Sequence, residues 1–277
     1  MHRQTLLALA LILAPCAAQA ELRENIEFAV NGGVSLTLDA NVPDGPGPFP
    51  TVIVVHGGGW INGDKQTYVK PILPPLTKAG FTWFTINYRL ASKAHFPAQQ
   101  EDLDSAIRWV KKHAKEYKAD PNHMAILGES AGGQIVSLGG ADYKKDTRVQ
   151  AVVVLYGPHD LLHRARQMGT VGENVMRLLD VPDKLDDATV QKLRAASPIT
   201  FVKKDMPPYL LIHGTKDDKV PYELSVSMCA KMKEAGASCE LFTVQDGIHG
   251  MGGWEKLPNG QAYKEKVVEW LKNKLSK

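Results

Sequence analysis

The chain has 277 residues, 44% of them hydrophobic, and a net charge of +3 at neutral pH. This length suits one large α/β domain or two small ones, with enough apolar residues for a sizeable core. Basic and acidic residues are mixed in short segments, which indicates solvated faces and excludes a dedicated nucleic-acid surface.

The first twenty residues have the pattern of a secretory signal peptide. Residues 1–20 begin with a basic segment, continue with the apolar run 6–13 and end on Ala-Gln-Ala, so we expect cleavage after Ala20. The mature protein would then be residues 21–277, secreted or periplasmic. The apolar run is too short to remain in a bilayer, and no later stretch reaches the roughly 20 apolar residues of a membrane span.

After this segment, the chain changes from a hairpin pattern to alternating strands and helices. Asn31-Gly32, between the alternating segments 21–30 and 34–40, is typical of a tight turn. Apolar runs then predict strands at residues 51–55, 81–87, 124–127, 151–155, 209–212 and 239–244. Amphipathic segments predict helices at residues 99–117, 131–138, 222–234 and 262–275. The pattern predicts an α/β fold with a mostly parallel central sheet and helices on both faces.

Residues 158–208 are much longer than a plain crossover between two strands requires. Helical patterns at 171–179 and 188–195 predict that this insertion covers one edge of the sheet as a short cap or lid. The alternative is a solvent-facing insertion that never contacts a substrate.

The stretch "LGESAGGQ" follows a predicted strand directly and begins a predicted helix. It contains Gly-x-Ser-x-Gly, in which the glycines make room for a nucleophilic serine on a tight strand-to-helix turn. The pattern alone arises by chance, but the strand before it and the helix after it favour this interpretation. Ser130 is the predicted nucleophile, and the N–H of Ala131 at the helix start would face a developing oxyanion.

A serine nucleophile needs a base that is oriented by an acid, in the chain order Ser, Asp/Glu, His for this kind of turn. His249, in "QDGIHGM", is the candidate base because it follows the last predicted strand. The acid lies in "HGTKDDKVP", where Asp217 and Asp218 compete. Asp217 is preferred because the residues after it can turn into the next helix, which leaves Asp218 as a surface carboxylate.

Three glycines and a tryptophan follow the predicted strand 51–55 in "HGGGW". Glycine lets backbone N–H groups approach a carbonyl oxygen closely, so Gly58 and Gly59 are the predicted partners of Ala131 in an oxyanion hole. A phosphate-binding loop is the rival interpretation, but neither of its sequence patterns is present. Trp60 lines the substrate pocket or shields the loop.

Two cysteines remain in the mature chain, Cys229 and Cys239. Export makes a disulfide between them possible, and two free thiols are the alternative. No His/Cys pair recurs at metal-ligand spacing, so we expect neither a metal nor an organic cofactor.

With these residues in place, the chain resembles the α/β-hydrolase superfamily. The resemblance is to the esterase and lipase group that includes hormone-sensitive-lipase-like esterases and the acetylxylan and feruloyl esterase-like proteins. The matching stretches are "HGGGW", "NYRLA", "FPAQQEDLDSAIRWV", "DPNHMAILGESAGG", "SPITFV" and "PPYLLIHGTKDDKVP". The resemblance implies Ser130, Asp217 and His249 as a catalytic triad, with the oxyanion hole assigned above.

Two departures from the group leave the chemistry unchanged but lie near the predicted pocket walls, so the group's substrates do not carry over directly. Ser92 replaces the proline of "YRLAP", and the segment around the base reads "IHGM" where the group has "GHGF"-like residues. Arg89, Asp102 and Asp160 lie in matching stretches and are predicted to be structural ion pairs or hydrogen-bond anchors.

The sequence thus predicts an exported serine carboxylic-ester hydrolase that forms an acyl-enzyme. Its expected substrates are short acyl esters or the acetyl and feruloyl esters of plant polysaccharides, by analogy with the group. A serine amidase or peptidase of the same fold is the alternative. A non-catalytic binding module is a third possibility, which the presence of all three triad candidates disfavours.

Overall fold

The computed structural model describes residues 20–276. The predicted signal peptide lies outside the described residues except for Ala20. Among the helices of residues 20–276, none has the length and apolar character needed to cross a membrane.

An eight-stranded sheet forms the centre of the molecule, in the order β1-β2-β4-β3-β5-β6-β7-β8. Its strands are β1 (Glu21–Asn31), β2 (Val34–Val42), β3 (Phe49–Val55), β4 (Thr82–Ile86), β5 (Ala119–Glu129), β6 (Ala151–Leu155), β7 (Tyr209–Gly214) and β8 (Cys239–Val244). The hairpin β1-β2 is antiparallel and joins β4 in the antiparallel sense, whereas all pairings from β4 to β8 are parallel. The carboxyl ends of the parallel strands therefore meet at one edge, where ligand sites of open α/β sheets form.

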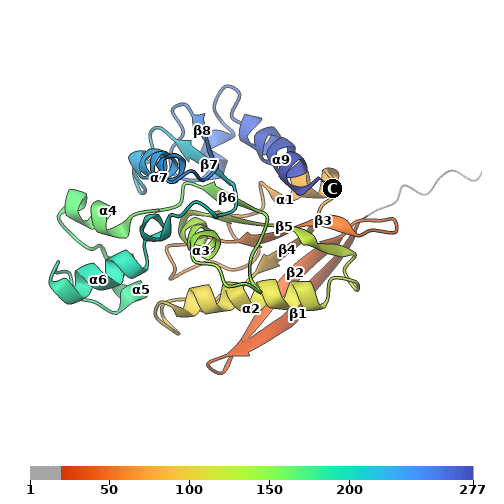
Figure 1. Ribbon diagram of the computed structural model, residues 1–277, viewed down its shortest axis with the longest axis horizontal. Helices are drawn as coiled ribbons and strands as arrows, with labels where there is room; N and C mark the ends of the chain where they lie inside the picture. Colours follow the sequence, from red (N-terminus) through yellow and green to blue (C-terminus); the bar gives the residue numbers. More distant parts are fainter. Residues whose placement is uncertain (1–19, 277) are drawn as a thin grey trace, which may run out of the picture.

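Helices cover both faces of the sheet because its central strands are apolar on both sides. Ile53 and Val55 of β3 belong to one hydrophobic cluster, and Val52 and Val54 belong to the other. Residues of α2 (Ala98–Lys112), α3 (Ser130–Ala141) and α7 (Glu223–Glu234) complete the first cluster. Residues of α1 (Leu73–Lys78), the short α8 (Met251–Trp254) and α9 (Ala262–Leu275) complete the second. Figure 1 shows α2 and α3 in front of the sheet.

The insertion at residues 158–208 consists of α4 (Leu161–Met168), α5 (Glu173–Leu179), α6 (Asp187–Ala195) and the 3-10 turn η1 (Pro198–Phe201). Asp160 caps α4, since its carboxylate accepts a hydrogen bond from the His163 N–H at 2.8 Å. Asp186 caps α6 in the same way through the Thr189 N–H. The three helices lie together at one end of the molecule (Figure 1).

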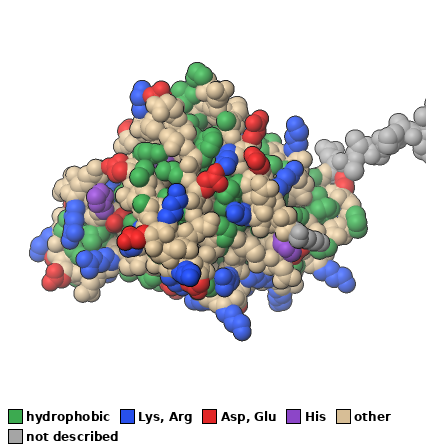
Figure 2. Space-filling view, turned by 45° about the horizontal axis from the view of Figure 1, so that its top comes forward, with side chains coloured by type: hydrophobic (Ala, Val, Ile, Leu, Met, Phe, Trp, Pro, Cys, Tyr) green, Lys and Arg blue, Asp and Glu red, His purple; other side chains and the backbone are tan. Residues whose placement is uncertain are grey.

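An ion pair and a disulfide outside the insertion stabilise the framework. Arg89 and Asp102 form a buried ion pair, with Nη2 2.8 Å from Oδ1, and the Arg89 N–H also donates to Asp102. Cys229 of α7 and Cys239 at the start of β8 form a disulfide, with their Cα atoms 5.4 Å apart. On the face shown in Figure 2, basic and acidic side chains are interspersed.

Candidate active site

The turn from β5 into α3 is strained in the manner expected for a nucleophile elbow. Ser130 has a φ of +52°, a left-handed conformation that non-glycine residues rarely adopt. A Cβ added to Gly128 would overlap the Gly132 carbonyl, and one added to Gly132 would overlap the carbonyls of Val55 and His56. The two glycines are therefore required for α3 to turn back against β3, and this packing holds Ser130 in its strained conformation.

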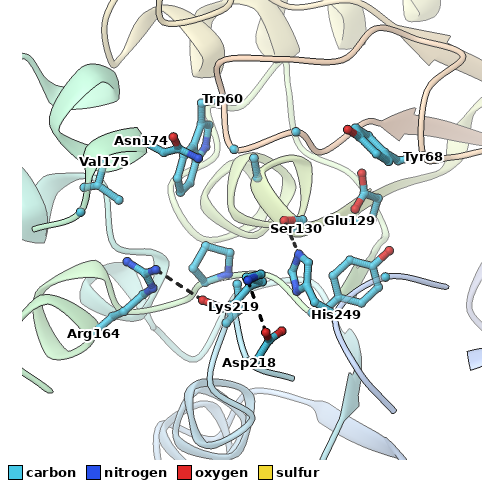
Figure 3. Close-up of a pocket in the computed structure, with 18 of the residues that line it drawn as sticks. Trp60, Tyr68, Glu129, Ser130, Arg164, Asn174, Val175, Asp218, Lys219 and His249 are labelled. Atoms are coloured by element: carbon cyan, nitrogen blue, oxygen red, sulfur yellow. Dashed lines mark hydrogen bonds and ion pairs between the residues drawn. The ribbon is translucent and has the colours of Figure 1, made fainter. Parts of the chain in front are cut away.

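Three residues from three strand-end loops form a continuous hydrogen-bond series. Ser130 Oγ lies 2.9 Å from His249 Nε2 (Figure 3), and His249 Nδ1 lies 2.8 Å from Asp217 Oδ2. Because an ionised carboxylate only accepts hydrogen bonds, Nδ1 carries the proton and Nε2 is free to accept the Ser130 hydroxyl proton. The structure thus brings together the three residues that the sequence assigned to the triad.

Asp217 is held by more than its contact with His249. Its side chain is fully buried, and its Oδ1 accepts hydrogen bonds from the N–H groups of Lys219 and Val220, each at 2.9 Å. Burial alone would raise the pKa of Asp217, but hydrogen bonds from His213 and His249 and the charge of His249 outweigh it. The pKa therefore stays below the usual range of a carboxyl group, and Asp217 is ionised at neutral pH.

Asp218, the competing acid, lies at the rim of the site. Its carboxylate is 68% exposed and pairs with Lys219 at 3.3 Å. The difference between the two neighbouring aspartates follows from the loop, which turns Asp217 inward and Asp218 outward.

His213 is a buried neighbour of the candidate triad that the sequence analysis did not identify. Its Nε2 lies 2.9 Å from the Val220 carbonyl and 3.2 Å from Asp217 Oδ2, and its Nδ1 lies 2.7 Å from Ser225 Oγ. Both neighbours of Nε2 are acceptors, so Nε2 carries a proton, and Ser225 Oγ is the hydrogen-bond partner of Nδ1. His213 is thus a buried donor that holds the acid loop. The sequence could have identified His213 by its place in "HGTKD", at the strand end four residues before the acid.

The glycine loop after β3 contributes to the same site. Gly58 and Gly59 have φ values of +98° and +62°, and both line one cavity with Ser130 and Ala131. The Gly58 carbonyl accepts hydrogen bonds from Ile61 and Asn62, whereas no acceptor within residues 20–276 engages the N–H of Gly58 or Gly59. These N–H groups are consequently available to a ligand beside Ser130.

Glu129 links the glycine loop to the elbow, and the sequence analysis did not assign it a role. Its buried carboxylate accepts a short hydrogen bond from the Gly57 N–H. Burial raises the pKa of Glu129 to about 7, against the lowering effects of that hydrogen bond, of the His249 charge and of the Tyr156 hydroxyl. The sequence could have identified Glu129 by its place directly before the serine of the Gly-x-Ser pattern.

Trp60 both lines the cavity and supports the loop, since only 5% of its surface is exposed. Its indole Nε1 donates to Gln134 Oε1 at 3.0 Å, and Gln134 Nε2 donates to the Ala196 carbonyl at 2.8 Å. Trp60 therefore lines the cavity and also shields the glycine loop. Through Gln134 of α3, the loop is connected to Ala196 of the insertion.

The cavity has a volume of about 830 Å³. Its lining comes from the glycine loop, the elbow, the acid and base loops and helices α4 and α5. Insertion residues in the lining include Leu161, Arg164, Asn174 and Val175. The insertion therefore forms one wall of the cavity that contains Ser130 (Figure 3).

Comparison with known proteins agrees with this arrangement. Residues 38–232 match the model of the family BD-FAE. The probable carboxylic ester hydrolase LipM of Mycobacterium tuberculosis is 33% identical over 64% of this chain and 43% of its own. Esterase LipQ of the same organism is 29% identical over 90% of this chain and 61% of its own. The chain spans about half the length of these curated relatives.

A solved structure, described as a truncated form of carbohydrate esterase from gut microbiota, has the same fold. It superimposes with a TM-score of 0.80 over 95% of this chain and 99% of its own, at 26% identity. The fold is the α/β-hydrolase fold, as the resemblance implied.

Proposed function

The chain belongs to the BD-FAE family, and on that basis we propose that it is a serine carboxylic-ester hydrolase that works through an acyl-enzyme. The observation that carries the proposal is the hydrogen-bond series from Asp217 through His249 to Ser130, in a cavity lined by Gly58 and Gly59. The relatives described as ester hydrolases support the reaction class.

In the proposed mechanism, Ser130 Oγ attacks the ester carbonyl carbon while His249 Nε2 takes the hydroxyl proton. The N–H groups of Gly58, Gly59 and Ala131 stabilise the negative oxygen of the tetrahedral intermediate. Collapse of the intermediate breaks the bond to the alcohol oxygen, which receives the proton from His249. A water molecule then gives its proton to His249 and hydrolyses the acyl-enzyme by the same steps in reverse.

Two carboxylates stabilise the imidazolium that forms twice in this cycle. Asp217 contacts Nδ1 directly and remains ionised throughout, because its pKa is low. The charge of His249 also favours ionisation of Glu129, so the buried carboxyl group and the imidazolium stabilise each other as charges.

For the substrate, we propose short acyl esters carried by carbohydrates, such as acetyl or feruloyl groups on plant polysaccharides. The solved relative described as a carbohydrate esterase supports this choice, and a cavity of about 830 Å³ leaves space for a sugar-linked ester. The leader pattern in residues 1–20 supports export, which would give the protein access to such material.

The reaction is tested by hydrolysis of p-nitrophenyl acetate, butyrate and octanoate, methyl ferulate and acetylated xylan. We expect turnover by the wild type and a loss of kcat by roughly 10⁶-fold in Ser130→Ala, because the nucleophile is gone. Asp217→Asn should lower kcat by about 10⁴-fold. Asp218→Asn is the matched control, and its exposed position predicts a change below about tenfold.

Labelling by a fluorophosphonate complements the kinetics. Wild type should gain one covalent adduct on Ser130, and Ser130→Ala should gain none. A folded protein that hydrolyses no ester and takes no label would contradict the proposal and favour a non-catalytic binding module.

A further inference from the structure

Arg164 places a positive charge in the cavity wall that the triad does not use. It lies on α4 and lines the cavity. In Figure 3, Arg164 lies on one side of the cavity, and Glu129 and Tyr68 lie on the opposite side. Its one side-chain hydrogen bond within residues 20–276 is a long one, from Nη2 to the Lys219 carbonyl at 3.4 Å. A guanidinium has five N–H donors, so most of its capacity is unused.

The contrast with other arginines shows what Arg164 lacks. Hydrogen bonds that Arg23, Arg89 and Arg108 donate to Glu21, Asp102 and Asp146, respectively, raise the pKa values of these arginines. Burial instead lowers the pKa of Arg164, and no carboxylate opposes this effect. A partly buried guanidinium without an anion is an unfavourable arrangement in a folded protein.

The carboxylates that line the cavity already have other partners. Glu173 pairs with Arg177 at 2.6 Å, Asp218 pairs with Lys219 at 3.3 Å, and Glu129 accepts the Gly57 N–H. None of them lies within ion-pair distance of Arg164 in the part of the chain that the structure describes. The charge of Arg164 is thus available to a ligand.

We propose that Arg164 is a subsite for a carboxylate group carried by the ester substrate, which rests on and deepens the proposed function. The planar guanidinium binds a carboxylate through two parallel hydrogen bonds. A carboxylate suits the site better than a phosphate dianion, because Glu129, Glu173 and Asp218 line the same cavity and would repel a second negative charge. The carboxylate belongs to either the acyl half or the alcohol half of the ester.

Matched substrate pairs test the subsite and distinguish the two halves. Mono-p-nitrophenyl glutarate and its terminal carboxamide differ only by a charge in the acyl half. 4-Acetoxybenzoate and 4-acetoxybenzamide differ by a charge in the alcohol half. For each pair, kcat/KM is measured at fixed ionic strength with wild type, Arg164→Gln, Arg164→Lys and Arg166→Gln, the last an exposed control on the same helix that does not line the cavity.

We expect Arg164→Gln to lower kcat/KM for the charged member of one pair by about tenfold to a hundredfold, the usual effect of a hydrogen bond to an ionised group. The carboxamide should change less than about threefold. Arg164→Lys should retain part of the preference for the charged ester, since lysine keeps the charge but lacks the two parallel N–H donors of the guanidinium. Arg166→Gln should match the wild type. Equal losses on both members of each pair, or no loss on either, would overturn the subsite.

Inhibition of the wild type provides a test that does not depend on how the variants fold. Free glutaramate or 4-hydroxybenzoate, each with a single negative charge, should compete with p-nitrophenyl acetate, whereas inorganic phosphate at the same ionic strength should not. Inhibition by phosphate as strong as that by the carboxylates would overturn the carboxylate assignment. If the enzyme hydrolyses the neutral esters but shows no preference for charged ones, only the Arg164 subsite is contradicted. If it does not hydrolyse p-nitrophenyl acetate at all, the proposed function itself is contradicted.

Discussion

At the scale of single residues, one carboxylate receives four hydrogen-bond donors from three parts of the chain. His249, Lys219 and Val220 donate to Asp217 at 2.8 to 2.9 Å, and His213 approaches at 3.2 Å. The inward aspartate could be predicted from its place after a strand. The role of His213 could not, because it depends on contacts of the folded loop, with the Val220 carbonyl and Asp217 at Nε2 and with Ser225 at Nδ1.

Replacing His213 tests whether it positions Asp217. In His213→Leu, Asp217 loses a donor that lowers its pKa, so the acidic limb of the kcat/KM profile should move to higher pH. We expect kcat to fall about tenfold with little change in KM. His213→Gln, which retains an N–H donor, should recover part of both effects, and His163→Leu, at an exposed position of α4, should show neither. A lower kcat with an unchanged pH profile would mean that His213 only supports the fold.

At the scale of elements, the sequence predicted the strands better than the helices. All eight strands form, because each is a short apolar run or part of a hairpin. The helix predicted for residues 99–117 ends at Lys112, since residues 113–118 turn and place Tyr117 edge-on to Phe84. Helices α1, α4 and α8 were not predicted. Two prolines in α1 and two glycines in α8 are unfavourable for a helix and obscure the pattern there.

The disulfide between α7 and β8 gives a prediction at this scale. Cys229→Ser/Cys239→Ser should lower the free energy of unfolding by about 2–3 kcal/mol, because a bridge over ten residues restricts the unfolded chain. The activity should be unaffected, since neither cysteine lines the cavity. Urea unfolding with and without reductant checks this: reductant should destabilise the wild type only. A wild type that is insensitive to reductant and exposes two thiols on unfolding would show that the bridge is not formed.

At the scale of the whole molecule, the cavity is lined by segments from Gly58 to Gly252. The sequence predicted this combination of segments less well than it predicted the strands. The triad and the glycine loop follow patterns that a reader can find in the chain. Arg164 belongs to no such pattern, and Glu129 occupies a variable position of Gly-x-Ser-x-Gly. Their roles depend on burial and on the partners that the fold supplies. The insertion was found by its length, but its contact with the cavity required the packed structure.

The stability of the molecule should depend on the ionisation of Glu129. Its folded pKa of about 7 exceeds the ordinary value near 4.5, so its contribution to stability is full below pH 4.5 and is lost as the pH rises through 7. Between pH 5 and pH 9 the wild type should lose roughly 2–3 kcal/mol more of its unfolding free energy than Glu129→Gln. Urea unfolding of both proteins at the two pH values measures the difference. Parallel losses would show that Glu129 does not titrate in this range.

The link between Gly57 and Glu129 has a consequence for how this sequence can diverge. A Cβ at position 57 would overlap the Glu129 carboxylate, and a shorter side chain at position 129 would leave the Gly57 N–H without its acceptor. Each single change damages the loop beside Ser130, although a coordinated pair of changes restores the contact. Positions 57 and 129 should therefore covary: a homologue altered at one of them should carry a compensating change at the other.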